Sequence, residues 1–154
     1  SFTVSGRRGS AILAVTKTGT YGQKLTLASI SGGGTKTYNL TSDGINRKFT
    51  LSGTTLFNQT TTIPTAISVI GSARTGRILS GGSLRVTNDM TLVTCDYIPS
   101  AVTWTAGCNC PTSGSWNGSC SSGSTSVLTM TGCGTGTYTE GSTTTTVALD
   151  RCGT

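Results

Sequence analysis

Short runs of alternating apolar and polar residues dominate the pattern of this chain. In the run Gln23-Lys-Leu-Thr-Leu, one polar residue separates Leu25 from Leu27, and the same two-residue period recurs along the sequence. Because successive side chains of a strand point to opposite faces, this period predicts half-buried β-strands. The runs that show it lie at 23–27, 36–40, 48–51, 67–69, 84–86 and 145–149.

Residues that favour turns separate these runs. The turn signals lie at 32–34, 42–44, 81–82, 117–118 and 134–136. Runs spaced by about 8–12 residues are typical of sandwiches and barrels. No stretch shows a sustained apolar stripe of helical period, so we expect at most one short helical turn. The predicted fold is all-β: an antiparallel β-sandwich or barrel-like domain with a disulfide-stapled C-terminal region.

The composition supports this prediction. The chain of 154 residues contains 33 Thr, 20 Ser and 22 Gly, and only 10% of its residues are charged. Disordered chains are poor in β-branched and aromatic residues and rich in Pro and Glu. Here β-branched residues are abundant, while Pro occurs 3 times. Threonine suits the exposed face of a strand, so the composition favours a folded β-protein.

Charge and cysteine divide the chain near residue 94. Residues 1–94 hold ten Lys or Arg and two Asp, a net charge of +8, whereas residues 95–154 carry −2. All six cysteines lie in the second part. We therefore predict a basic, strand-rich region at 1–94 and a cysteine-rich β region at 95–154, which are two subdomains or two ends of one continuous domain. No run of 18 apolar residues occurs, so no membrane-spanning helix is expected.

The cysteines predict disulfides. Their spacing contains no C-x₂-C pair, and the chain has no histidine, which argues against a zinc site and against a thioredoxin-like redox site. An even number of cysteines in a Gly-, Ser- and Thr-rich chain indicates three disulfides and an oxidising compartment, extracellular or at the cell surface. Six cysteines allow 15 pairings, and the sequence leaves these open. The predicted disulfide residues are Cys95, Cys108, Cys110, Cys120, Cys133 and Cys152.

The residue types that most catalytic sites need are missing. Without histidine there is no Ser-His-Asp triad and no Cys-His dyad. Paired carboxylates could serve glycoside hydrolysis, but three of the five acidic residues are explained by turns or a neighbouring arginine. The candidates are Asp43, Asp89, Asp96, Glu140 and Asp150, of which Asp96 and Glu140 are the least explained. We expect a non-enzymatic protein without catalytic residues, cofactor or metal ion.

Aromatic residues near the cysteines are candidate ligand contacts. Tyr97, Trp104 and Trp116 lie beside small polar residues, and exposed aromatic rings of this kind stack on sugars. Tryptophan also packs against disulfides in small β-domains. We expect Trp104 to lie in the core, and for Trp116 both roles stay open.

Basic residues of the first part are candidate contacts to anionic surfaces, such as acidic glycans or envelope phosphates. Their scattered positions fit equally well with solubility and with protection of edge strands. A groove for nucleic acid is a further alternative. The residues are Arg7, Arg8, Arg47, Lys48, Arg74, Arg77 and Arg85.

These features favour a non-enzymatic extracellular structural or adhesive protein. The composition resembles that of secreted bacterial or phage fibre and pilus-type domains. We expect a subunit or tip domain of a surface fibre, pilus or adhesin that forms homo-oligomers or filaments and binds a glycan or an anionic cell surface. Segments 1–4 and 143–149 are strand-like and terminal, and so are suited to pairing across subunits. The alternatives are a viral or phage structural protein whose basic N-terminal region faces nucleic acid, and a carbohydrate-binding module.

Overall fold

The computed structural model of the chain describes residues 2–8, 11–18, 23–71, 73–149 and 152, and of the first two strands it gives the backbone. Described residues form twelve β-strands and no helix. The strands are β1 (Phe2–Arg8), β2 (Ala11–Thr18), β3 (Lys24–Ile30), β4 (Lys36–Leu51), β5 (Thr54–Ile70), β6 (Ile78–Ser80), β7 (Ser83–Asn88), β8 (Thr94–Thr103), β9 (Ser113–Cys120), β10 (Thr125–Gly132), β11 (Thr135–Glu140) and β12 (Thr143–Ala148).

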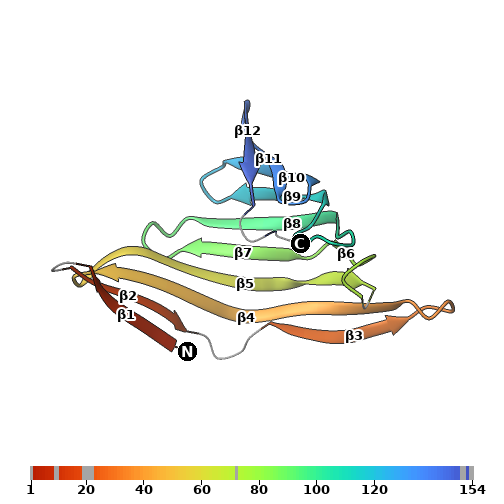
Figure 1. Cartoon of the computed structure of the whole chain (residues 1–154), viewed down its shortest axis with the longest axis horizontal. Coiled ribbons are helices and arrows are strands. Elements are labelled where there is room, and N and C mark those ends of the chain that lie inside the picture. Colours follow the sequence, from red (N-terminus) through yellow and green to blue (C-terminus); the bar gives the residue numbers. More distant parts are fainter. Residues whose placement is uncertain (1, 9–10, 19–22, 72, 150–151, 153–154) are drawn as a thin grey trace.

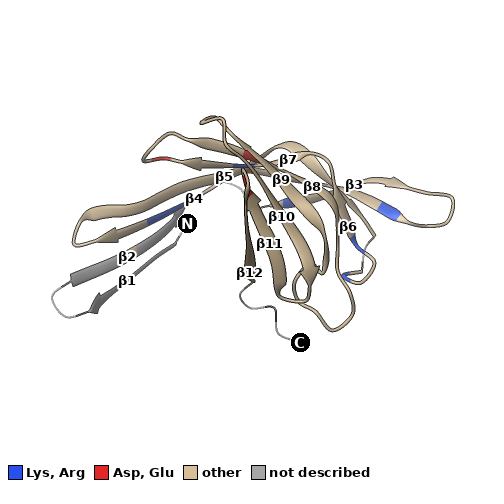
Figure 2. Ribbon diagram, turned by 90° about the horizontal axis from the view of Figure 1, so that it is seen from above, with Lys and Arg blue, Asp and Glu red and all other residues tan. Residues whose placement is uncertain are grey.

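All twelve strands belong to one antiparallel sheet, which confirms the predicted all-β class. The order is β1-β2-β4-β5-β6-β8-β9-β10-β11-β12, with β3 beside β4 and β7 between β5 and β8. The terminal strands β1 and β12 therefore form the two ends of the sheet (Figure 1). The sheet curls strongly, so that β9–β12 stand at a steep angle to the long β4–β5 hairpin (Figure 2).

The β4–β5 hairpin is longer than the sequence pattern predicts. The alternating runs at 36–40 and 48–51 belong to one strand, and the turn predicted at Ser42-Asp-Gly is wrong. Instead, the pairing of β4 with β5 shifts register on either side of Ser42. Such a bulge inserts an extra residue and bends a strand without ending it, and it uses the same small and polar residues as a turn.

The hydrophobic core is small and is formed by β5, β8, β10 and the loop between β8 and β9. Among the described residues, the buried apolar side chains are Ile63, Ile67, Val69, Val102, Cys108 and Met130. Ile67 and Val102 are the most completely buried of these, at 1% and 0% exposure. A core of this size leaves much of the stability to other sources, among them the disulfides.

Three disulfides confirm the cysteine prediction. Cys95 pairs with Cys120 across the adjacent strands β8 and β9. The other two, Cys108–Cys133 and Cys110–Cys152, fix the loop between β8 and β9 to the β10–β11 turn and to the segment after β12. Intact disulfides of this number indicate an oxidising compartment.

The sheet continues across the compositional boundary near residue 94. Strand β7 of the basic region pairs with β8 of the cysteine-rich region, with Val86 opposite Cys95. Among the residues that the structure describes, none forms a helix that could cross a membrane.

Candidate functional site

A ladder of side chains crosses five strands of the C-terminal half. The strand registers place one residue of each strand β7 to β11 directly opposite the next. In order, the row is Leu84, Tyr97, Gly118, Ser126 and Glu140. The middle of the row holds the two smallest residues, Gly118 and Ser126, and the larger side chains lie toward its ends. The surface of the sheet is therefore recessed at the middle of the row.

A second row runs beside the first. Trp116 lies opposite Pro99 on one side and opposite Leu128 on the other, and Leu128 lies opposite Tyr138. On each of the strands β8 to β11, the residue of the second row is two residues away from the residue of the first row. Because side chains of a strand alternate between faces, both rows lie on one face of the sheet. Three aromatic rings, Tyr97, Trp116 and Tyr138, therefore gather on this face around the two small residues.

A side chain at position 118 would collide with the neighbouring strands, so this position requires glycine. A Cβ at this position would lie 2.6 Å from Ser126 Oγ and 2.8 Å from Tyr97 Cε1. The ring of Tyr97 therefore covers the β9 backbone at Gly118. Asn117-Gly118 was predicted as a turn, which is wrong: both residues lie within β9, where the missing side chain makes room for the ring.

The two rows enclose a hollow of about 270 Å³, to which we refer as the aromatic hollow. Its lining residues are Leu84, Tyr97, Trp116, Ser126, Leu128 and Tyr138. Burial, followed by the neighbouring Tyr138 and Glu140, raises the pKa of the Tyr97 hydroxyl above its ordinary value. At the rim, the Tyr138 hydroxyl donates a hydrogen bond to Glu140 Oε2 at 3.3 Å. The hollow is thus apolar inside, and the Glu140 carboxylate, which does not line it, is bonded to one of its lining residues, Tyr138.

Of the three predicted aromatic contacts, the structure brings together Tyr97 and Trp116. Trp104 lies apart, half-buried after β8, and lines a second hollow of about 370 Å³. That hollow is also lined by Gln23, Leu25, Leu40, Val69, Arg77 and Leu79. The binding role predicted for all three residues stays a prediction.

Sequence reasoning missed Tyr138, Leu128 and Leu84 as partners of Trp116 and Tyr97. Each lies in an ordinary alternating run, and nothing local distinguishes it from other half-buried strand residues. Only the strand register places them beside the tryptophan. The separation of Tyr138 and Glu140 by two residues was the one available signal, because that spacing puts both on one face of a strand.

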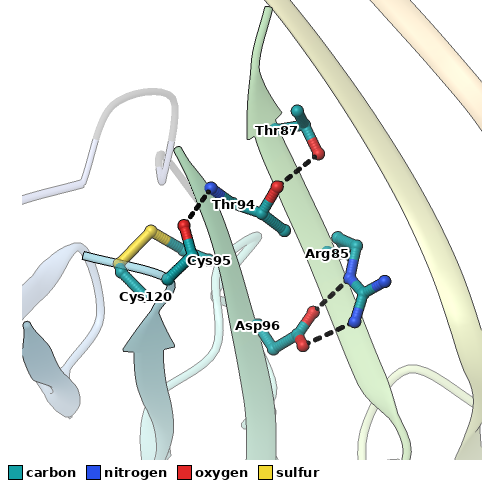
Figure 3. A network of polar contacts seen from close by, with 7 residues as sticks. Arg85, Thr87, Thr94, Cys95, Asp96 and Cys120 are labelled. Carbon is teal, nitrogen blue, oxygen red and sulfur yellow. Dashed lines mark hydrogen bonds and ion pairs between the residues drawn. A yellow bond between two sulfur atoms is a disulfide. The ribbon is translucent and has the colours of Figure 1, made fainter. Parts of the chain in front are cut away.

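The opposite face of β7 and β8 is polar. Arg85 and Asp96 lie directly opposite each other, and the guanidinium donates from Nε and Nη2 to the two carboxylate oxygens at 2.7 and 2.8 Å (Figure 3). The next pair on that face joins the hydroxyls of Thr87 and Thr94 at 3.2 Å. Asp96 was one of the two acidic residues that the sequence explained least, and the structure shows it in a bidentate ion pair with Arg85.

The Arg85–Asp96 pair predicts a measurable titration. Hydrogen bonds from Arg85 lower the pKa of Asp96 below its ordinary value. Whatever stability the pair contributes is therefore present above the ordinary carboxyl pKa and is lost as pH falls through the lowered one. We expect the Asp96 carboxyl resonance in an NMR titration to move at higher pH in Arg85→Gln than in the unaltered protein. The Thr87→Val variant should leave that titration unchanged, and an equal response in both variants would contradict the assignment.

The remaining described carboxylates serve separate contacts. Asp43 is 3.7 Å from the ammonium of Lys24. Asp89 accepts hydrogen bonds from Asn46 and Thr60 at 2.9 and 2.8 Å, which tie the β7–β8 turn to the long hairpin. Asp150 lies outside the described residues. Within the described residues, no group of three His, Cys, Asp or Glu is placed to hold a metal ion.

The predicted anionic-surface contacts are spread over β1, β4, the β5–β6 loop and β7, and the blue segments of Figure 2 show that the described ones do not gather in one place. Arg47 and Lys48 are exposed on β4, and Arg74 donates to the side chain of Asn109 in the β8–β9 loop. Arg77 lines the second hollow, and Arg85 is paired with Asp96. The side chains of Arg7 and Arg8 lie outside the described part of β1. A role of these residues on anionic surfaces stays a prediction.

Three comparisons with known proteins give no match. No family model matches the chain. No curated protein and no solved structure is significantly similar to it. The geometry of the sheet and of its hollows therefore carries the functional argument.

Proposed function

We propose that this chain is a non-enzymatic extracellular structural or adhesive protein, a subunit or tip domain of a surface fibre, pilus or adhesin that acts by self-assembly and surface binding. The observation that carries the proposal is the open surface of the sheet. The chain of 15.6 kDa exposes 9124 Å². A compact monomer of that mass exposes about 7,200 Å². The excess, about 1,900 Å², is larger than the roughly 800 Å² that each partner buries in a standard interface.

Strand β3 is the clearest part of this open surface. It pairs with β4 on one side, and all seven of its residues are exposed. Its apolar side chains, Leu25, Leu27 and Ile30, are 52%, 49% and 57% exposed. An exposed apolar edge strand is a template for pairing with another chain, and soluble proteins usually protect such edges. A second copy of this chain is the occupant that the proposal assigns to it.

The two ends of the sheet favour open-ended assembly. The end strands β1 and β12 differ in sequence, and β3 lies on the same side of β4 as β2 and β1. Addition of the β12 end of one copy to the β1/β3 end of another would be a head-to-tail contact. Contacts of this type form rings or filaments rather than closed two-fold dimers. Intact disulfides, which persist outside the reducing cytosol, fit an exported subunit of such an assembly.

Light scattering across a dilution series tests the proposal. We expect the molar mass to rise with concentration well beyond that of a dimer. Leu27→Lys should reduce the apparent association constant at least tenfold, because it places a charge in the apolar contact. Thr26→Lys adds the same charge to the opposite face of β3 and should reduce it less. A monomer at all concentrations would refute self-assembly.

A further inference from the structure

The aromatic hollow has a feature that assembly does not explain: an apolar, aromatic lining beside a carboxylate, that of Glu140. We propose that the aromatic hollow binds a quaternary ammonium ligand of the choline type. This inference goes beyond the proposed function and does not depend on self-assembly, since the hollow lies on a face of β7–β11, whereas the proposed assembly contact uses the strands at the two ends of the sheet.

The ring composition of the hollow suits a cation. Tyr97, Trp116 and Tyr138 all line it, and they come from three strands, so three separate rings on one face of the sheet border the enclosed volume. The face of an aromatic ring carries a negative potential that attracts ammonium groups, most strongly for tryptophan, with about 0.5–2 kcal/mol per contact. A methylated ammonium group loses less hydration free energy on moving from water into an aromatic site than an unmethylated ammonium group does.

The charges around the hollow have the complementary sign. Glu140 lies at the end of the first row and accepts a hydrogen bond from the hydroxyl of Tyr138, a residue that lines the hollow. The negative potential that this carboxylate contributes is also one cause of the raised pKa of Tyr97. None of the residues that line the hollow is a lysine or an arginine. The neighbouring Arg85 lies on the other face of the sheet, where Asp96 neutralises it.

A neutral sugar is the competing occupant, and the lining suits it less well. A sugar carries a hydroxyl on nearly every ring carbon, and burying these hydroxyls without partners costs free energy. The side chains of the lining offer three hydroxyls and the indole N–H of Trp116, and the Tyr138 hydroxyl is already bonded to Glu140. The volume of about 270 Å³ is sufficient for a compact cation. For comparison, an apolar cavity of about 150 Å³ holds benzene.

Titration with choline and with its neutral carbon isostere, 3,3-dimethylbutan-1-ol, tests the inference at constant ionic strength. The two ligands have the same shape, and only choline is charged. In the Trp104→Leu variant, where Trp116 is the remaining tryptophan, we expect saturable quenching or a shift of the fluorescence by choline, with an affinity about tenfold or more above that of the isostere. Equal affinities of the two ligands would overturn the cation assignment, and so would the absence of saturable binding at about 100 mM choline.

Two substitutions locate the site. Trp116→Leu removes the main ring of the wall, and Glu140→Gln removes the charge from an exposed position of β11 where the fold does not depend on it. Each should weaken choline binding tenfold or more by calorimetry. Trp104→Leu, at the tryptophan outside the hollow, should leave binding unchanged. If Glu140→Gln binds choline as well as the unaltered protein, or if neutral monosaccharides bind and choline does not, the inference fails, whether or not the protein assembles.

Discussion

Replacing Cys108 and Cys133 together by alanine is expected to lower the free energy of unfolding by about 3.5 kcal/mol. The two residues are 25 positions apart, and a loop of that length carries this chain-entropy term in the unfolded state. Alanine keeps an apolar side chain at Cys108, which is buried. Because small domains have total stabilities of about 5–15 kcal/mol, the loss is a large fraction of the whole. Urea unfolding followed by far-ultraviolet circular dichroism measures it.

The Cys95–Cys120 pair provides the matched control. It closes a loop of the same length, 25 residues, so its chain-entropy term is equal. In the folded state, however, Cys95 and Cys120 already lie opposite each other in the β8–β9 ladder. Cys108–Cys133, in contrast, holds the 104–112 loop against the β10–β11 turn. Hydrogen exchange should therefore increase in that loop in the first variant and not in the control. A loss below about 1 kcal/mol in both variants would contradict the stabilising role of the disulfides.

The sequence correctly predicts strands in which apolar and polar residues alternate locally. Leu25 and Leu27 lie in β3 as expected, and the run predicted at 145–149 lies in β12 up to Ala148. The disulfide state also follows from residue types alone. The pairing does not, because it depends on which strands are neighbours, and three cysteines within 108–120 pair with three different elements.

The sequence alone could not distinguish a glycine that lies within a strand from a glycine that forms a turn. Gly118 beside Asn117 has the composition of a hairpin turn, yet it lies in β9 because Tyr97 of β8 needs its space. Gly44, predicted in a turn, lies within β4 in the region where the register shifts, and there its own backbone needs the positive φ of +140°. The sequence identified only part of the aromatic hollow. Trp116 and Tyr97 were candidate ligand contacts, whereas Tyr138 becomes one only through its strand register with Leu128.

A further glycine, Gly114 at the start of β9, carries the second large prediction. Its φ is +88°, and a Cβ there would lie 2.3 Å from Ala101 O and 2.6 Å from Val102 Cα. Both of these are backbone atoms of β8, and Val102 is fully buried, so neither can yield easily. Gly114→Ala is expected to cost about 2–5 kcal/mol, as the sum of about 1–2 for the left-handed backbone and about 1–3 for the overpacking.

Gly107→Ala separates these two contributions. Gly107 lies in the adjoining loop with a similar φ of +77°, and nothing lies within 4 Å of the position its Cβ would take. It should therefore show the backbone cost alone, about 1–2 kcal/mol. The difference between the two variants in urea unfolding then measures how closely β8 and β9 approach at Gly114. Since Trp116 lies two residues further along β9, Gly114→Ala should also alter its fluorescence in the folded protein. Equal losses in both variants would mean that β9 accommodates the methyl group, and that the spacing between β8 and β9, which positions Tyr97 beside Trp116, is not fixed at this glycine.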